Sequence, residues 1–473
     1  MNKSTLLLSL ALIVLSGLTA SVHTSTKDEW KKRTIYQLLT DRFSVGGPNG
    51  HECDNLSNYC GGTFNGIKSQ LDYIQGMGFD AIWISPVVEN TDGGYHGYWA
   101  KDLYKINPRF GTEDDLRSLV DECHKRDIWV MVDVVYNHVG PIDTEYSQIK
   151  DFNKPEHYHT KCQVTNFNDP GNMEFCRLSN LPDLDQNHPE VHKILSDWTV
   201  WLVEKFNLDG LRIDTVAFIN KDFWSALKKE TLEGRLKDIY VVGEVFDGRS
   251  DFINQYGSII GGVLNYPMYY TVQNVYGRSE SMYQIRNRMY EQDAVFSDAD
   301  ALGTFIDNHD NNRFLNLQGD WKLFMNALTY TIFGRGIPIV YYGSEQLFNG
   351  AHDPFNRETL WNKFNTQSDM YKFMSKLVNT RRNHIDNIAA SKQVERYITD
   401  KLYAFTRGDV FVATTNVGSY RDQRIEFEVT YHEYAEGTTL CNIFYENDCV
   451  KVQNNKFPVV LTYGESKVFV PRK

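Results

Sequence analysis

The runs IWVMVDVVYNH (residues 128–138) and GLRIDTV (residues 210–216) decide the fold class of this chain. Each is a short, nearly continuous apolar segment that ends in polar residues, which is typical of a strand buried on both faces of a parallel sheet. The amphipathic helical pattern VHKILSDWTVWLVEKFN (191–207) lies between them. Strand, helix and strand in this order form a βαβ unit, so the two runs predict an α/β fold.

The same alternation continues from Lys27 to about residue 385, and most of the apolar runs are separated by a helical pattern such as EDDLRSLVDECHKR (113–126). Eight repeats of strand and helix predict a (β/α)₈ TIM barrel. The eight expected strands are TIYQLLTDRF (34–43), DAIWISP (80–86), IWVMVDVVYNH (128–138), GLRIDTV (210–216), IYVVGEV (239–245), GGVLNYP (261–267), LGTFIDNHD (302–310) and IPIVYYG (337–343).

Two segments fall outside this alternation. From Val139 to about Asp183, after the third expected strand, the chain has no clear helical pattern. A structureless loop of that length is improbable in a compact domain. We therefore expect a small inserted domain over 138–183, with a disordered excursion as the alternative. Short alternating strands follow residue 385 and predict a C-terminal antiparallel β-sandwich domain over 386–473. The barrel is then expected over 27–137 and 184–385.

The first residues, 1–20, predict a signal peptide. Lys3 precedes an apolar stretch of about a dozen residues, which is too short to span a bilayer, and small residues follow it. Cleavage is expected between Ala20 and Ser25, with an uncleaved anchor as the alternative. The protein is then secreted, or reaches an acidic digestive compartment by the secretory route.

The composition restricts the class of partner. A net charge of −12 argues against nucleic acid and anionic membranes, which are met by clustered Lys and Arg. The aromatic content of 14% suits packing against the apolar faces of sugars as well as core filling. We expect a neutral substrate, no nucleic-acid or membrane partner after removal of the signal, and a monomer.

Seven cysteines in an exported chain predict disulfide bonds. Cys123 lies in a helical pattern and is expected to be buried and unpaired. Asn55 begins an Asn-Leu-Ser sequon, which predicts a glycoprotein. Local spacing suggests the pairs Cys53–Cys60, Cys162–Cys176 and Cys441–Cys449.

Three acidic residues, Asp214, Glu244 and Asp310, each follow an expected barrel strand. Barrel enzymes keep their chemistry at this end of the strands. Asp214 and Glu244 end consecutive strands about 4.8 Å apart, and retaining glycosidases hold two carboxyl groups about 5 Å apart. Arg212 lies on the same strand face as Asp214 and could hold it ionised. Glu244, which follows Tyr-Val-Val-Gly, is expected to be the more shielded carboxyl.

Five motifs then carry a resemblance to a known family. Their order and separations are similar to those of the α-amylase family of glycoside hydrolases, and most similar to its secreted fungal-type members. The likeness extends over nearly all of the mature length. The motifs are DVVYNH (133–138), LPDLD (181–185), GLRIDTV (210–216), GEVFD (243–247) and FIDNHD (305–310).

The resemblance implies a role for each carboxylate: Asp214 is the nucleophile, Glu244 the general acid/base, and Asp310 the group that stabilises the transition state. It also implies a set of side chains that bind the sugar. These are Arg212, His138, His309, Tyr98, His96, Trp99, Asp353 and Arg357.

The resemblance further implies a Ca²⁺ site that joins the inserted domain to the barrel. Asn137 and Asp183 match its side-chain ligands, and the backbone carbonyls of Glu174 and Phe218 would complete it. The alternative for the two side chains is an Asn cap and an exposed Asp.

The chain departs from the family pattern at Ala217 and Phe218, where fungal α-amylases carry Lys-His, so two polar contacts on the leaving-group side should be missing. We expect an α-amylase that cleaves internal α-1,4-glucosidic bonds of starch or glycogen with retention. An exo-acting or transglycosylating relative, of α-glucosidase or maltogenic type, is the main alternative. A noncatalytic carbohydrate-binding relative is the other.

Overall fold

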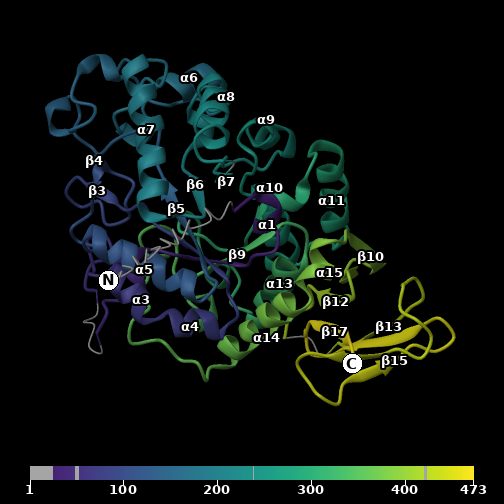
Figure 1. Ribbon diagram of the computed structural model, residues 1–473. Coiled ribbons are helices and arrows are strands. Elements are labelled where there is room, and N and C mark those ends of the chain that lie inside the picture. The colour runs from purple at the N-terminus through teal and green to yellow at the C-terminus, as the bar shows by residue number, and fades with distance from the viewer. Residues whose placement is uncertain (1–24, 48–52, 238, 420–422, 473) are drawn as a thin grey trace, which may run out of the picture.

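The computed structural model describes residues 25–47, 53–237, 239–419 and 423–472, so the expected signal peptide lies outside the described residues. Its centre is a seven-stranded parallel sheet in the order β7-β6-β5-β2-β1-β9-β8. Four of these strands, β5, β6, β7 and β9, are labelled in Figure 1. The strands are β1 (Ile35–Leu38), β2 (Ala81–Ile84), β5 (Trp129–Val134), β6 (Gly210–Ile213), β7 (Tyr240–Gly243), β8 (Gly303–Thr304) and β9 (Ile337–Tyr341).

The segment GGVLNYP (261–267) closes the sheet between β7 and β8, although it is not a regular strand. Val263 pairs with Gly243 and Leu264 with Gly303, each by an isolated parallel bridge. The preceding helix ends at Gly261, which has a φ of 107°, and the next helix starts at Tyr266. Too few residues remain between the two helices for a longer ladder. The seven strands and this bridged segment together occupy the eight predicted strand positions of the barrel.

The barrel interior follows from the two-residue period of its strands, because alternate side chains point inward. Toward the amino ends of the strands these side chains are apolar and form one buried cluster, which includes Ile35, Trp129 and Met131. Two residues further along the same faces, Gln37 and Asp133 are buried polar groups. The interior therefore changes from an apolar plug to a polar layer toward the carboxyl ends of the strands.

Amphipathic helices cover the outside of the barrel. In α7, Val191, Leu195, Trp198 and Leu202 recur at helical spacing and are buried, and complete burial of such side chains stabilises by about 1.5–3 kcal/mol each. The helical segment before β2 is divided at Gln70 into α3 and α4. The main helices are α3 (Phe64–Ser69), α4 (Leu71–Gly76), α5 (Glu113–Lys125), α7 (Pro189–Phe206), α8 (Lys221–Leu227), α9 (Ser250–Ile260), α10 (Tyr266–Val272), α11 (Tyr283–Val295), α13 (Trp321–Phe333) and α14 (Asp369–Asn383).

Local sequence explains where these helices begin and end. The Thr112 hydroxyl accepts a bond from the Asp115 N–H, and the Asp115 carboxylate accepts one from the Thr112 N–H, which is a capping box at the start of α5. Asn207 ends α7 in the left-handed conformation. Within the described part of the chain, no helix combines the length and apolar character needed to cross a membrane.

The segment between β5 and α7 is folded. It contains the short helix α6 (Pro170–Phe175), several single turns and the disulfide Cys162–Cys176. Phe152 and Tyr158 from this segment belong to the same hydrophobic core as the barrel helices. A hairpin of β3 (Val88–Asn90) and β4 (Ala100–Ile106) projects after β2.

The C-terminal strands form an antiparallel β region, drawn from yellow-green to yellow in Figure 1. A six-stranded sheet, β10-β11-β12-β17-β14-β15, and the pair β13–β16 enclose one apolar cluster. The structure contains the disulfide Cys441–Cys449, which joins facing residues of β14 and β15, and also Cys53–Cys60. The strands are β10 (Gln393–Ile398), β11 (Leu402–Arg407), β12 (Val410–Thr415), β13 (Ile425–Val429), β14 (Thr439–Asn442), β15 (Cys449–Lys451), β16 (Phe457–Leu461) and β17 (Lys467–Pro471).

Cys123 is a free, buried cysteine on α5, as expected. Burial raises the pKa of its thiol, which keeps it protonated and unreactive. Asn55 is exposed, so the sequon is accessible.

Candidate active site

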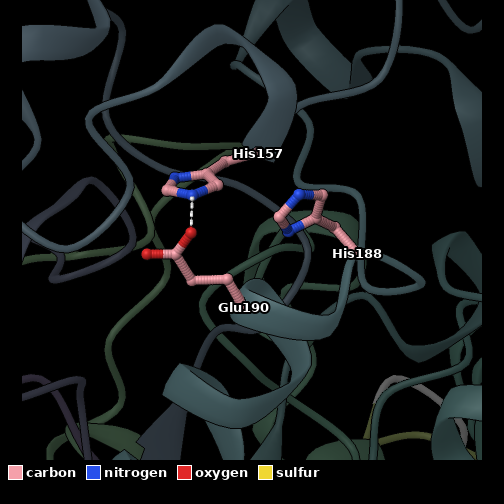
Figure 2. Close-up of side chains that lie close together, drawn as sticks. All are labelled: His157, His188 and Glu190. Carbon is pink, nitrogen blue, oxygen red and sulfur yellow. Dashed lines mark hydrogen bonds and ion pairs between the residues drawn. The ribbon is translucent and has the colours of Figure 1, made fainter.

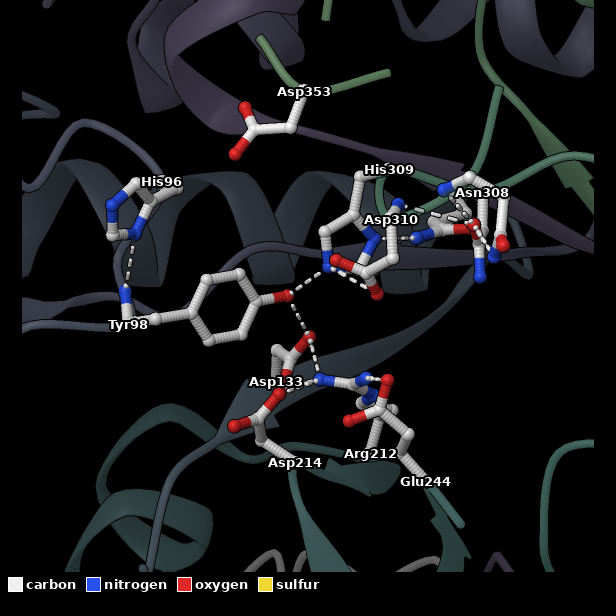
Figure 3. Close-up of polar contacts among 12 residues, drawn as sticks. His96, Tyr98, Asp133, Arg212, Asp214, Glu244, Asn308, His309, Asp310 and Asp353 are labelled. Carbon is white, nitrogen blue, oxygen red and sulfur yellow. Dashed lines mark hydrogen bonds and ion pairs between the residues drawn. The ribbon is translucent and has the colours of Figure 1, made fainter. Parts of the chain in front are cut away.

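Asp214 and Glu244 lie side by side at the carboxyl ends of two paired strands. Asp214 directly follows β6 and Glu244 directly follows β7, and the last residues of these strands, Ile213 and Gly243, face each other. Each of the two acids is 7% exposed, so accessible surface does not distinguish them and the greater shielding of Glu244 stays a prediction. Asp310 enters the same region from the loop after β8 (Figure 3).

Arg212 is the centre of this acidic group. Its Nη1 atom donates to Asp133 Oδ1 at 2.9 Å and to Asp214 Oδ1 at 2.8 Å. Its Nη2 atom lies 3.1 Å from Glu244 Oε1. Asp133 and Arg212 are register partners in β5 and β6, so the pairing of these strands places them together.

One guanidinium faces three carboxyl groups in a buried space, which cannot all be ionised at low cost. Burial raises the pKa of Glu244 well above its usual value; Arg212 opposes this rise, and Asp214 and Asp310 add to it. Burial also raises the pKa of Asp133, to about 7.

Hydrogen bonds distinguish these two acids. Asp133 Oδ2 accepts from the Tyr98 hydroxyl at 2.8 Å and from Trp83 Nε1 at 3.2 Å, in addition to Arg212, and these bonds favour the carboxylate. Among the residues that the structure describes, Glu244 accepts the Thr215 N–H at 3.0 Å and otherwise contacts Arg212. Glu244 is therefore the group of this cluster best placed to hold a proton.

A hydrogen-bonded chain orients the Tyr98 ring. Gln37 Nε2 donates to His309 Nδ1 at 2.9 Å, which leaves the imidazole proton on Nε2. His309 Nε2 lies 2.6 Å from the Tyr98 hydroxyl, which in turn donates to Asp133. Burial lowers the pKa of His309 well below its usual value, so this histidine is a neutral donor.

His138 and His96 hold the backbone beside that ring. His138 Nε2 donates to the Tyr98 carbonyl at 3.2 Å, and His96 Nδ1 accepts from the Tyr98 N–H at 3.0 Å. Trp99 packs edge-on against His96 with ring centroids 4.7 Å apart. Burial lowers the pKa of both histidines, so their effect on the site is positional rather than ionic.

Asp310 and Asp353 are linked through Arg357. Arg357 Nη1 lies 2.9 Å from Asp353 Oδ1, and its Nη2 lies 3.7 Å from Asp310 Oδ1. The Tyr95 hydroxyl donates to Asp353 and accepts from Arg357. The side chains of Asp310 and Asp353 are 30% and 51% exposed, so both carboxylates are open to a ligand.

The three proposed catalytic acids line a cleft of about 390 Å³. Tyr98, Asp214, Glu244 and Asp310 line it. The remaining lining is largely apolar. Ala217 and Phe218 were expected at the site, whereas its other apolar residues were not predicted from the sequence; these are Phe167, Met173, Leu178, Phe246 and Phe252.

The ring of Phe218 meets that of Phe167 edge-on with centroids 6.3 Å apart. Phe167 belongs to the inserted segment and is 58% exposed, whereas Phe218 belongs to the turn after β6. The position at which family members have a polar pair is thus part of an apolar wall.

A second group of oxygen atoms lies beneath the insertion. The side-chain oxygen of Asn137 lies 3.2 Å from Asp183 Oδ1 and 3.0 Å from the Phe218 carbonyl oxygen. Three acceptors without a donor repel one another unless the amide is reversed or a cation lies among them. Because the other amide position, 3.3 Å from His138 Nδ1, suits a donating nitrogen, these oxygens fit a hard cation.

Asp183 is buried, and burial raises its pKa to about 7, which a bound cation would counteract. His159 Nδ1 lies 2.7 Å from the other oxygen of Asp183 and fixes the carboxylate from behind. The alternative of an exposed Asp at this position is therefore excluded. The Glu174 carbonyl, on α6 of the insertion, stays a predicted ligand.

Sequence reasoning missed two residues of the polar layer, Asp133 and Gln37. Each is a polar residue in an otherwise apolar strand, which was an available signal, but its partner lies on another strand. Only the closed barrel brings Asp133 to Arg212 and Gln37 to His309.

Comparisons with known proteins bear on this site. Residues 37–392 match the family model described as "Alpha amylase, catalytic domain". The chain is 36% identical to an alpha-amylase of Saccharomycopsis fibuligera, over 100% of this chain and 98% of the relative. It is 37% identical to alpha-amylase 1 of Schwanniomyces occidentalis, over 94% of this chain and 91% of the relative.

Solved structures agree with these sequence relatives. An alpha-amylase from Malbranchea cinnamomea superposes with a TM-score of 0.89 at 38% identity, covering 94% of this chain and 97% of the other. An alpha-amylase from Geobacillus thermoleovorans complexed with acarbose superposes with a TM-score of 0.84 at 30% identity, covering 94% and 99%.

Proposed function

This chain belongs to the alpha-amylase family of glycoside hydrolases and has α-amylase function, and we propose that Asp214, Glu244 and Asp310 carry out its catalysis. The proposed reaction is the internal cleavage of α-1,4-glucosidic bonds in starch, glycogen and related oligosaccharides, with retention of configuration. The observation that carries the residue roles is the placement of Asp214 and Glu244 on paired strand ends around Arg212.

In the first step, Asp214 attacks the anomeric carbon while Glu244 gives its proton to the departing glycosidic oxygen. Arg212 supports this division of roles, because it bonds directly to Asp214 and keeps that nucleophile ionised and oriented. The bond between Asp214 and the sugar forms as the glycosidic bond breaks, and the leaving chain departs with the proton of Glu244.

In the second step, the ionised Glu244 takes a proton from water, and the resulting hydroxide attacks the anomeric carbon and releases Asp214. Two inversions give net retention. Glu244 recovers its proton, which its burial and its acidic neighbours favour.

The remaining polar groups would bind the sugar. Tyr98 presents its ring as the platform for the reacting glucose. His309 and His138 would bind the glucose hydroxyls by sharing with them the N–H groups that they direct at Tyr98. Asp310 would accept hydroxyl hydrogen bonds beside the reacting carbon and stabilise its positive charge. Asp353 and Arg357, which are paired with each other, would bind the adjacent glucose unit.

We also propose that Asn137, Asp183 and the carbonyls of Phe218 and Glu174 hold Ca²⁺. The three oxygens that converge at Asn137 support this proposal. When bound, the ion would supply structural cross-linking and no chemistry. It would join the inserted domain, 138–183, to the barrel strand that precedes it.

The proposed domain division is a barrel over 27–137 and 184–385, with the insertion between these parts and a β domain over 386–473. The proposed route is secretion, supported by the charged and apolar pattern at the N-terminus and by three disulfides. We further propose that the enzyme acts as a monomer.

A transglycosylating activity is the second candidate, and the apolar wall of Phe167 and Phe218 is the observation that favours it. A sugar acceptor packs against such a wall, whereas water has no polar partner there. The resemblance to fungal α-amylases implies that Ala217 and Phe218, which follow Asp214 in the turn after β6, lie on the side from which the leaving chain departs.

The experiment has two parts. Replacement of Glu244→Gln should reduce starch hydrolysis by about 10²–10⁴-fold or more, because general acid–base catalysis contributes this much and the residue serves both steps. The time course of products from amylose distinguishes the activities. Early mixed oligosaccharides support endo-hydrolysis, whereas glucose alone or cyclic products from the start would overturn it.

A further inference from the structure

Three side chains that the proposed catalysis does not use meet where the insertion joins α7 (Figure 2). His157 ends the single turn Pro155–His157, His188 is the N-cap residue of α7, and Glu190 lies in its first turn. One possible ligand atom from each lies within 4.8 Å of the other two. We propose that these three residues form a binding site for a divalent transition metal of the zinc class.

The geometry of one ligand pair already fits. His157 Nε2 lies 3.2 Å from Glu190 Oε2. Zinc bonds to nitrogen and oxygen of about 2.0–2.1 Å in a tetrahedral site place two ligand atoms about 3.3 Å apart. The ligand atom of His188 lies within 4.8 Å of the other two, so it must move by at most the difference between 4.8 Å and that separation, a change within reach of side-chain rotation of a half-exposed ring.

The imidazoles have few other partners. His157 has no exposed surface, its ring packs edge-on to Phe152 and to His188, and its Nε2 atom faces only the exposed carboxylate of Glu190. The Nδ1 atom of His188 is buried without a hydrogen-bond partner. A metal ligated by the two rings would use these groups, whereas the hydrogen bonds present do not account for both histidines.

The donor set selects the metal. Two imidazole nitrogens and one carboxylate suit Zn²⁺ and, among other ions, Co²⁺ and Ni²⁺, whereas Ca²⁺ and Mg²⁺ prefer oxygen ligands alone. Three protein ligands leave a fourth position for water. The site therefore differs in chemistry from the oxygen cluster at Asn137.

The two sites are nevertheless connected through the backbone. The Asp185 N–H donates to the His157 carbonyl at 2.8 Å, and the His188 N–H donates to the Asp185 carbonyl at 3.0 Å. Asp185 closes the LPDLD segment that also contains Asp183. Metal binding at His157 and His188 would thus fix the second end of the insertion, and it must be measured with the oxygen cluster saturated by Ca²⁺.

Lys154 is the present cationic partner of Glu190, with Nζ 2.7 Å and 2.9 Å from its two oxygens. Both side chains are about half exposed, and such surface pairs contribute little. A dication held by two imidazoles would displace the lysine. Removal of Lys154 should then tighten metal binding, an effect that a purely structural ion pair does not predict.

The test uses the full-length secreted protein in excess Ca²⁺, with Zn²⁺ as the probe. Bound zinc is measured by elemental analysis, affinity by competition with a chromophoric chelator, and geometry by the visible spectrum of the Co²⁺ form. We expect one zinc per chain, at least about tenfold weaker binding in His157→Ala, His188→Ala and Glu190→Gln, and tighter binding in Lys154→Met. His192→Ala, on the same helix and half-buried, is the matched control.

Circular dichroism without zinc shows whether each variant is folded. If His157→Ala does not fold, the half-exposed His188 and exposed Glu190 decide the result. Absence of zinc binding to the natural protein, equal binding in the His188 and Glu190 variants, or equal loss in His192→Ala would overturn the proposal. Loss of starch hydrolysis is not a readout, so failure here is separable from failure of the proposed function.

Discussion

Arg212 Nη2 lies 3.1 Å from Glu244 Oε1, so the acid that is proposed to donate a proton is in contact with a permanent cation. The cation lowers the pKa of Glu244, whereas burial, Asp214 and Asp310 raise it, and burial is the largest of these effects. The protonation of Glu244 is therefore a balance that single substitutions can move in either direction.

Removal of the Arg212 cation should raise the pKa of Glu244. In Arg212→Gln the pKa of Glu244 rises, because the only opposing charge is lost, and the alkaline limb of kcat/KM against pH moves to higher pH. Activity falls at least about 100-fold because Asp214 loses its partner. Arg313→Gln, which removes another fully buried arginine, should reduce stability and leave the limb in place. An unmoved limb in Arg212→Gln would separate Arg212 from the acid.

Removal of the negative charge of Asp310 should lower the pKa of Glu244. Asp310→Asn takes away a carboxylate that raises the pKa of Glu244, so the alkaline limb of the residual activity should move to lower pH. Asp353→Asn is the control, since Asp353 binds Arg357 and is not among the groups that shift Glu244. A shift to higher pH in Asp310→Asn would contradict the proposed electrostatics.

The Tyr98 hydroxyl connects two buried groups, Asp133 and His309. Tyr98→Phe keeps the ring but leaves both partners short of a bond, which should lower the free energy of unfolding by about 1–3 kcal/mol. It should also lower kcat more than it raises KM, because the ring platform remains. Tyr95→Phe loses contacts to Asp353 and Arg357 instead and should mainly raise KM. Denaturant unfolding and steady-state kinetics distinguish these outcomes.

The oxygen cluster predicts a calcium-dependent stability. A chelator should lower the Tm of the natural protein, since a ligand at 1,000 times its Kd contributes about 4 kcal/mol. Asp183→Ala should have a low Tm that Ca²⁺ no longer raises. Asp185→Asn, whose side chain contacts His159 Nε2 and the Asn187 N–H and is not a proposed ligand, should still respond to Ca²⁺. An unchanged calcium response in Asp183→Ala would place the ion elsewhere.

The apolar wall predicts how the leaving chain is held. Restoring a polar pair with Ala217→Lys and Phe218→His should add up to two hydrogen bonds, each contributing about 0.5–1.5 kcal/mol, and so raise kcat/KM for short maltooligosaccharides about tenfold. The ratio of transfer to hydrolysis should fall. Chromatography of the products from maltotriose measures both effects, and Phe167→Ala tests the opposing face of the wall.

Much of the fold could be predicted because barrel strands are short, apolar and separated by amphipathic helices. The position of the sixth barrel strand could be predicted, but its irregular form could not. The helices on either side leave room between Gly261 and Tyr266 for two isolated bridges. In the C-terminal domain Cys441 and Cys449 flank NIFYEND, and this pattern predicts the hairpin of β14 and β15 with its disulfide. The strand β16 carries no such signal, because Pro458 interrupts its alternation.

The site could be predicted where one residue carries its own signal, as for Asp214 at a strand end. It could not be predicted where the signal is a relation between strands. Asp133 matters because its register partner is Arg212, and Phe167 matters because an inserted segment returns to face Phe218. Such pairs are fixed by tertiary packing rather than by local sequence.

The division of roles between Asp214 and Glu244 is the central claim, and one measurement tests it directly. α-Maltosyl fluoride needs no proton to release fluoride, so Glu244→Gln should still undergo attack by Asp214 but lack the base for the second step. Mass spectrometry of the digested protein should find a maltosyl ester on Asp214. An ester on Asp310 or Asp133, or rapid full turnover without any ester, would contradict the account.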